Sequence, residues 1–132
     1  MAAAGQPISN KRVPTILVVE DDTDTQQFLI DLLTAEGYHV LTAASGEEAL
    51  AMMEATAVDG VTLDLHLPDM DGYTVCRHIR RSQEGDVPIL VVSANRTSQH
   101  QAMACVAGAT DYLAKPFPPN ALLSRLAMLL RE

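Results

Sequence analysis

Five short apolar segments recur along the chain, over residues 15–19, 38–42, 61–65, 88–93 and 110–113. The first and the fourth are apolar at both odd and even positions and contain several β-branched residues. This pattern is typical of strands that are buried on both faces of a sheet. The segments therefore predict five β-strands.

A stretch with helical spacing follows each predicted strand. The apolar positions of the first such stretch are Phe28, Leu29, Leu32 and Leu33. Gly37 is a natural stop for this helix, and Ser45 is expected to cap the next one. Further helices are predicted over residues 71–81, 99–107 and 119–131. Because each parallel connection needs a long return path, the alternation predicts an α/β fold, a doubly wound five-stranded parallel sheet with five helices on its two faces.

The domain organisation follows from length and from the first residues. Residues 1–13 show no periodic pattern and are interpreted as a flexible tail, with an interaction arm as the alternative. Residues 14–132 are assigned to one domain, because 132 residues suffice for a single buried core. No apolar run is long enough to span a bilayer or to form a secretory leader, so we expect no membrane partner and a cytoplasmic location.

Composition argues against two classes of function. The formal net charge of −8 disfavours a surface that binds nucleic acid, which would need clustered Lys and Arg. Cys76 and Cys105 have no Cys-x-x-Cys spacing, and the histidines are scattered. A zinc site is therefore not expected, and the two cysteines are interpreted as reduced thiols.

Charged and hydroxyl side chains occur where the predicted strands end. In chain order these residues are Glu20, Asp21, Asp64, Ser93 and Lys115. Parallel sheets bind their ligands beyond the carboxyl ends of the strands. Carboxylates gathered there repel one another, so we expect a hard dication, Mg²⁺ or alternatively Mn²⁺, to hold them together. Three carboxylates (−3), the dication (+2) and the lysine (+1) then sum to a neutral cluster.

This cluster predicts phosphoryl chemistry at Asp64. A carboxylate is a competent nucleophile toward phosphorus, and phosphoryl transfer depends mainly on positioning and on neutralising charge. The Ser93 hydroxyl can bind one phosphoryl oxygen, and the small Ala94 beside it leaves room for the donor. Each residue taken alone also has a structural interpretation, since Asp22 or Thr23 is suited to cap the first helix. The joint placement on separate strands favours the functional interpretation.

Four ordered segments, residues 16–22, 64–72, 88–94 and 108–117, closely resemble the receiver domain of bacterial two-component response regulators. The resemblance extends over residues 15–131. It implies a flavodoxin-like receiver fold with strand order 2-1-3-4-5. It also implies that a phosphohistidine of a histidine kinase or histidine phosphotransfer domain is the donor. The domain would not be an enzyme in the usual sense, because it would catalyse only its own phosphorylation and dephosphorylation.

The resemblance also implies roles for individual residues. Asp64 matches the phosphoacceptor, and the peptide bond between Lys115 and Pro116 is expected to be cis. The residues that match the metal and phosphoryl contacts of receiver domains are Glu20, Asp21, Asp64, Ser93, Lys115 and the backbone carbonyl of His66.

A second group of matching residues concerns the response to phosphorylation. Tyr112 and Ser93 match a switch pair, in which the hydroxyl moves toward the phosphoryl group and the aromatic ring fills the vacated space. This change would alter the surface of helix 99–107, strand 110–113 and helix 119–131 for partner binding. His66 and Asn95 match positions that tune the lifetime of the acyl phosphate. The alternatives are a static rim residue for Tyr112 and a solvated loop side chain for His66.

Some positions depart from receivers that dimerise. Helix 99–107 lacks Lys and Arg, and Ala121 stands where those receivers have an acid. We therefore expect a monomer or a weak dimer, and Met103 suggests that this face docks another protein domain. An output domain is not found after the last predicted helix, so the output is expected from a separate partner or from a fused domain absent here.

Two rival functions remain open on sequence grounds. A binding module that has lost phosphorylation is expected to lack the acceptor, an acid or the lysine, and all of them are present. A phosphohydrolase that forms an aspartyl-phosphate is expected to carry Asp at the position of His66. A flavin or dinucleotide protein would need a glycine-rich or hydroxyl-rich loop after the first strand, where residues 20–22 would repel a phosphate.

Overall fold

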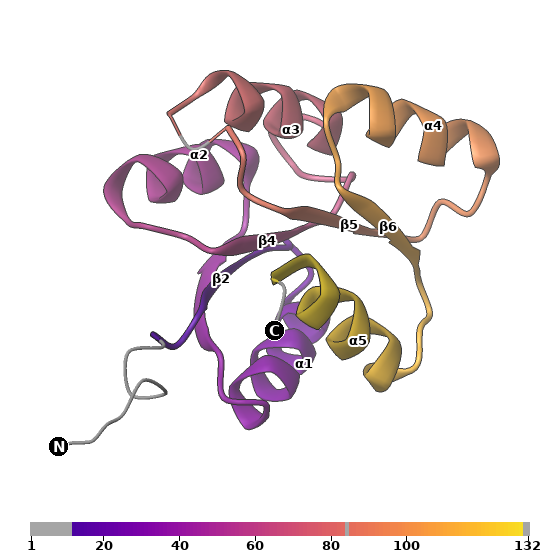
Figure 1. The fold of residues 1–132 in the computed structure, drawn as a ribbon. Coiled ribbons are helices and arrows are strands. Elements are labelled where there is room, and N and C mark those ends of the chain that lie inside the picture. Colours follow the sequence, from indigo (N-terminus) through magenta and orange to yellow (C-terminus); the bar gives the residue numbers. More distant parts are fainter. Residues whose placement is uncertain (1–11, 84, 131–132) are drawn as a thin grey trace, which may run out of the picture.

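The computed structural model describes residues 12–83 and 85–130, and the chain folds as an alternating series of strands and helices (Figure 1). The strands are β2 (Thr15–Val19), β3 (His39–Ala43), β4 (Gly60–Leu63), β5 (Ile89–Ser93) and β6 (Asp111–Ala114). The helices are α1 (Thr23–Ala35), α2 (Gly46–Ala55), α3 (Gly72–Arg81), α4 (Ser98–Ala107) and α5 (Pro119–Leu130).

All five strands form one parallel sheet in the order β3-β2-β4-β5-β6. Counted along the chain, this is the predicted order 2-1-3-4-5, so the expected fold is confirmed. Helices α1 and α5 cover one face of the sheet, and α2, α3 and α4 cover the other (Figure 1). This arrangement leaves the carboxyl ends of the strands open at one edge.

The core consists of two apolar layers separated by the sheet. Along β2, Leu17 and Val19 pack into the layer beneath α2, α3 and α4, whereas Ile16 and Val18 pack into the layer beneath α1 and α5. Successive side chains of a strand point to opposite faces, so a strand covered on both sides must be apolar at every position. The unbroken apolar pattern of the first segment therefore has a direct structural cause.

Element ends differ from the predictions by one or two residues. β4 ends at Leu63, so Asp64 lies just beyond the strand. Asp71 was expected inside a helix but is its N-cap, because its side chain accepts a hydrogen bond from the backbone N–H of Thr74. Asp22 caps α1, and Ser45 caps α2 as predicted.

The two ends of the chain are only partly described. Residues 1–11 of the expected tail, and Arg131 at the end of the last predicted helix, lie outside the described residues. Arg12, which falls within the expected tail, forms a two-pronged contact with Asp59 at 2.7 and 3.1 Å. None of the described helices combines the length and the apolar character needed to cross a bilayer.

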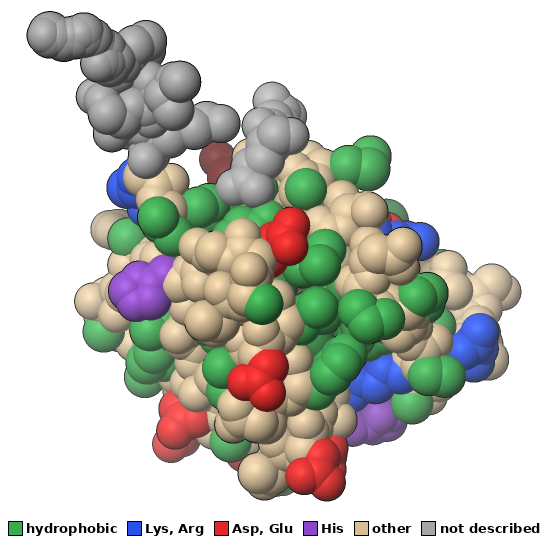
Figure 2. Space-filling view, turned by 90° about the horizontal axis from the view of Figure 1, so that it is seen from below, with side chains coloured by type: hydrophobic (Ala, Val, Ile, Leu, Met, Phe, Trp, Pro, Cys, Tyr) green, Lys and Arg blue, Asp and Glu red, His purple; other side chains and the backbone are tan. Residues whose placement is uncertain are grey.

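The outer surface of α1 and α5 is mixed in character. Figure 2 shows this side of the molecule, where carboxylates are dispersed among apolar side chains. Phe28 of α1 and Met128 of α5 are exposed large apolar residues, with 43% and 77% of their surface accessible. The Phe28 ring contacts the Phe117 ring at a centroid distance of 6.2 Å.

Candidate functional site

Three carboxylates meet where the neighbouring strands β2 and β4 end. Val19 and Leu63 are paired in register, so Glu20 and Asp64 leave the sheet side by side and Asp21 follows. One carboxylate oxygen from each acid lies within 4.8 Å of the others. Glu20 and Asp64 are buried, at 2% and 7% exposure, while Asp21 is open to solvent. The structure thus brings together the three acids that the sequence proposed.

Lys115 completes this cluster from the end of β6. Its Nζ donates to Glu20 Oε1 at 2.8 Å and lies 3.5 Å from Asp64 Oδ2. Its backbone N–H donates to the carbonyl of Ser93, and its peptide bond to Pro116 is cis. The ammonium group therefore faces the buried pair of carboxylates and not solvent.

The cluster is short of positive charge. Three carboxylates against one ammonium leave a net charge of −2. Burial, with the nearby charge of Asp64, raises the pKa of Glu20 although Lys115 opposes the shift. Burial alone would lower the pKa of Lys115, but the hydrogen bond to Glu20 and the charges of Asp64 and Glu20 raise it. Both directions indicate that an added cation would be favourable here.

The donor set fits a small hard dication. Carboxylate oxygens at this spacing are the ligands that Mg²⁺ prefers, and Mn²⁺ accepts the same groups. No Cys or His side chain belongs to this group within the described residues, so the site lacks the ligands typical of zinc.

Ser93 lies at the end of β5, between the acids and the lysine in the order of the sheet. Its side chain is fully buried, and its Oγ accepts a hydrogen bond from the backbone N–H of Asn95 at 3.2 Å. Ala94 is exposed at the mouth of the site. A hydroxyl and an open approach are therefore both present, as the sequence suggested.

The loops after β4 and β5 touch each other across the site. Asn95 Nδ2 lies 3.1 Å from His66 Nε2, and the backbone N–H of His66 contacts Asp64 Oδ1 at 3.3 Å. The half-buried Tyr112 donates its hydroxyl to the carbonyl of Asn95 at 2.6 Å. His66, Asn95 and Tyr112, which the resemblance grouped by role, are thus linked through Asn95.

Sequence reasoning missed two residues that shape the loop after β4. The Asp69 carboxylate accepts hydrogen bonds from the backbone N–H groups of Gly46 and Glu47, which hold its pKa below the ordinary value. Gly72 approaches the chain so closely that a Cβ there would lie 2.6 Å from the carbonyl oxygen of Asp64. A turn-forming Asp and Gly could be noticed in the sequence, but their distant partners could not.

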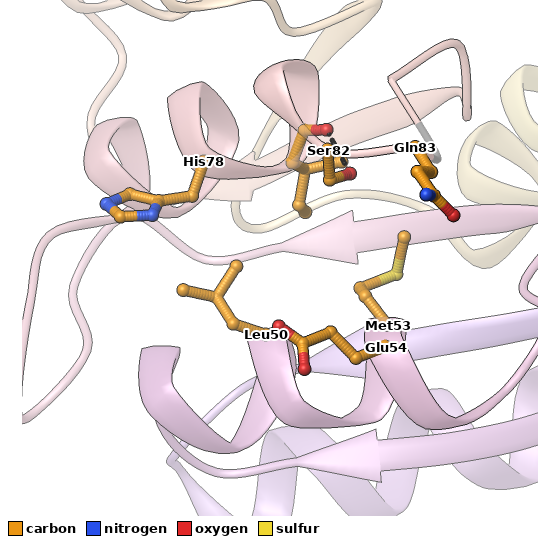
Figure 3. Close-up of a pocket in the computed structure, with 7 residues that line it drawn as sticks. Leu50, Met53, Glu54, His78, Ser82 and Gln83 are labelled. Atoms are coloured by element: carbon orange, nitrogen blue, oxygen red, sulfur yellow. Dashed lines mark hydrogen bonds between the residues drawn. The ribbon is translucent and has the colours of Figure 1, made fainter.

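A separate hollow of about 390 Å³ lies between α2 and α3. Figure 3 shows Leu50, Met53 and Glu54 of α2 opposite His78, with Ser82 and Gln83 beyond the end of α3. None of the clustered acids lines it. The hollow therefore does not belong to the candidate site.

Comparisons with known proteins agree with this architecture. Residues 16–127 match the response regulator receiver domain family. The chain is 41% identical over 117 residues to response regulator MprA of Mycolicibacterium vanbaalenii, and the aligned region covers 89% of this chain and 50% of MprA. It is 37% identical over 123 residues to transcriptional regulatory protein BaeR of Escherichia coli O6:H1, and this alignment covers 93% of the chain and 50% of BaeR. The chain thus spans about half the length of the curated relatives it matches.

A solved structure is similar in detail. The receiver domain of sensor histidine kinase PA1611 from Pseudomonas aeruginosa PAO1 superposes with a TM-score of 0.85 and is 34% identical, covering 92% of this chain and 100% of that one. That crystal structure has a magnesium ion coordinated in its active site cleft.

Proposed function

The chain belongs to the response regulator receiver domain family of two-component systems, and we propose that Asp64 accepts a phosphoryl group from a phosphohistidine donor. One observation supports this most directly. The Asp64 carboxylate is buried at the end of a central strand, with two further carboxylates within 4.8 Å and an ammonium group at 3.5 Å. A nucleophile, a cation site and a fixed positive charge are therefore within reach of one phosphorus atom.

The transfer can be written with these residues. A carboxylate oxygen of Asp64 attacks phosphorus while the bond from phosphorus to the donor imidazole nitrogen breaks, and the imidazole leaves with the electron pair and takes up a proton. Lys115 pairs with one phosphoryl oxygen, and the Ser93 hydroxyl donates to another. A dication held by Glu20, Asp21, Asp64 and the backbone carbonyl of His66 would neutralise phosphoryl oxygens when bound.

The donor and the output use different surfaces in this proposal. The donor, on a histidine kinase or a histidine phosphotransfer domain, docks beside α1, where the exposed Phe28 and the adjacent Phe117 offer an apolar contact. The output surface is formed by α4, β6 and α5, and on α4 Met103 and Val106 are 46% and 89% exposed. Such exposed apolar side chains suit a protein partner.

Phosphorylation acts on the domain itself. Receiver domains are phosphoacceptors and not classical enzymes, and we propose that hydrolysis by water returns Asp64 to its free carboxylate. His66 and Asn95 flank the acyl phosphate and set its lifetime, because they follow Asp64 and Ser93 by two residues and their side chains contact each other at 3.1 Å. The monomeric or weakly dimeric state, the cytoplasmic location and the absence of nucleic acid binding stay predictions.

The test is intact-protein mass spectrometry after incubation with acetyl phosphate and Mg²⁺. The wild type is expected to gain one phosphoryl group, and Asp64→Asn is expected to gain none. Asp24→Asn is the matched control, because Asp24 is an exposed acid of α1 outside the cluster. A phosphoryl group on Asp64→Asn, or none on the wild type and the control, would overturn the assignment.

A further inference from the structure

Lys115 reaches the acid cluster from the far edge of the sheet. It follows the edge strand β6, whereas Glu20 follows β2, which is three strands away in the order of the sheet. At the usual spacing of neighbouring strands this separation is about 14 Å. The Lys115 Nζ nevertheless lies 2.8 Å from Glu20 Oε1 and 3.5 Å from Asp64 Oδ2. The side chain therefore has little slack, and a displacement of the Lys115 backbone would be passed on to the ammonium group.

The sheet itself holds the Lys115 backbone on one side only. The N–H of Lys115 donates to the Ser93 carbonyl at 2.8 Å, which extends the pairing of β6 with β5 by one residue. Pro116 follows, and proline has no N–H to donate. The next residue therefore cannot continue the pairing, and the chain leaves the sheet directly after Lys115.

Arg96 supplies a second fixed point for the same residue. Its Nη1 donates to the Lys115 carbonyl at 3.0 Å. Arg96 belongs to the loop between β5 and α4, and both of its chain neighbours are themselves held. The Asn95 carbonyl accepts the Tyr112 hydroxyl at 2.6 Å, and Thr97 is the N-cap of α4. The Arg96 guanidinium thus connects a braced loop to the residue whose side chain enters the acid cluster.

We propose that Arg96 is a positioning residue that keeps the Lys115 ammonium group at the acid cluster by holding the Lys115 carbonyl. Ser93 holds the N–H of Lys115 and Arg96 holds its C=O, so both ends of the residue are fixed. The inference rests on the proposed function, in which Lys115 pairs with a phosphoryl oxygen. Because phosphoryl transfer depends on position, loss of Arg96 should slow it although every reacting group is still present.

The variant Arg96→Met removes the guanidinium donors and keeps an unbranched side chain. Arg96 is exposed, so the core should be unaffected. The matched control is Arg125→Met, because the Arg125 guanidinium also donates to a carbonyl of β6, that of Tyr112 at 2.8 Å. Tyr112 lies three residues before Lys115. A general loosening of β6 would follow from either substitution, whereas the position of Lys115 would be lost only with Arg96.

The deciding measurement is the rate of reductive methylation of Lys115 by formaldehyde and dimethylamine–borane in buffer with EDTA, followed by peptide mass spectrometry. Both reagents are uncharged, so the charge of Arg96 does not steer them. Lys11 is the only other lysine in the sequence and serves as the internal reference. The amine reacts from states in which it has left the carboxylates, so the rate measures how often it leaves them.

Arg96→Met is expected to methylate Lys115 about five times faster than the wild type, the size expected for one lost hydrogen bond, and Arg125→Met is expected to stay within about twofold of the wild type. A Lys115 rate in Arg96→Met equal to that of the wild type would overturn the inference. An equal acceleration in Arg125→Met would overturn it as well, because it would show a general loosening of β6.

The outcome is separable from failure of the proposed function, because methylation uses neither a phosphodonor nor Asp64 as a nucleophile. A wild type that gains no phosphoryl group from acetyl phosphate and Mg²⁺ would refute the acceptor assignment itself and leave the methylation rates standing. If the wild type gains one, Arg96→Met is expected to gain it about five times more slowly than Arg125→Met. Equal rates of uptake in the two variants would overturn the link between the position of Lys115 and phosphoryl transfer.

Discussion

Replacing Lys115 with Met should reveal how strongly the acid cluster depends on positive charge. The substitution keeps an unbranched side chain of similar length and removes the ammonium group that contacts Glu20 at 2.8 Å and Asp64 at 3.5 Å. The side chains of both acids are almost inaccessible, at 3% and 9% exposure, so water cannot replace the lost contacts. We expect a marked loss of stability in metal-free buffer.

The magnitude follows from the two distances. At an effective dielectric constant of about 20, unit charges 2.8 and 3.5 Å apart attract by roughly 6 and 5 kcal/mol. Lys115 is itself desolvated, and its side chain keeps 22% exposure, so the net loss is far smaller than that sum. Breaking a buried pair and leaving one charge unpaired typically costs about 3–5 kcal/mol. We expect a loss in the lower part of that range, because protonation of Glu20, whose pKa is already raised, relieves part of the repulsion.

The assay is urea unfolding at pH 7 with EDTA and again with Mg²⁺. At this pH Lys115 is charged in the wild type, because a raised pKa keeps its stabilisation present until the pH passes the elevated value above 10.5. Mg²⁺ at about 100 times its dissociation constant should restore roughly 2.7 kcal/mol in the variant. The variant should also bind Mg²⁺ more tightly than the wild type, because the competing ammonium is gone.

The chain offers a matched control in Arg125→Met. Arg125 pairs with Asp111 at 3.1 Å, but the two side chains are 41% and 39% exposed. Exposed ion pairs contribute about 0–1 kcal/mol, so this variant should lose little stability and should gain no more from Mg²⁺ than the wild type does. The reasoning fails if Lys115→Met loses no more than Arg125→Met, or if Mg²⁺ leaves its stability unchanged.

Three further substitutions test contacts that hold the fold together, the last of them beside the site. Arg80→Met should lower the free energy of unfolding, measured in urea, by about 2–4 kcal/mol, because the Arg80 guanidinium donates to three backbone carbonyls at 2.6–2.8 Å. Arg80→Lys should not restore this stability, because an ammonium group lacks the planar fork of donors. Asp59→Asn should lower the urea midpoint slightly at pH 7, with the difference closing below pH 3.8, because the Arg12 hydrogen bond lowers the pKa of Asp59 and that stabilisation disappears once the carboxylate is protonated. Gly72→Ala should cost about 1–3 kcal/mol and slow labelling by acetyl phosphate, since its Cβ would lie 2.6 Å from the Asp64 carbonyl; unchanged labelling would show that the loop relaxes freely.

The strands and the composition of the site could be predicted because both depend on local sequence. A strand covered on two faces must be apolar at every position, and the residue after it must lie at the sheet edge. This reasoning predicts Glu20, Asp64 and Lys115 at one edge of the sheet, and the structure brings them together. The strand order could not be predicted in this way, because hydrophobic periodicity does not say which strands are neighbours. That part came from the resemblance to a known family.

The rest depended on partners that are distant in sequence. The Asp69 carboxylate accepts a hydrogen bond from the first turn of α2, 22 residues earlier in the chain. The Arg80 guanidinium donates to the carbonyl of Gly108, 28 residues later. Nothing in the local pattern around either residue identifies these partners. The hydrogen bond from Arg96 to the Lys115 carbonyl could not be predicted for the same reason, since the two residues are 19 positions apart.

The stability of the fold and the chemistry of the site have separate physical sources in this chain. Stability comes from the two apolar layers, whose β2 and β4 residues are almost completely buried on either side of the sheet. The acid cluster lowers that stability, because it holds a net charge of −2 at a buried edge of the sheet. The same charge deficit favours the binding of a dication, and in the proposed function a phosphoryl group can approach only when that dication is bound. In the proposed function, the deficit that weakens the metal-free fold is therefore also what makes phosphorylation of Asp64 conditional on the metal.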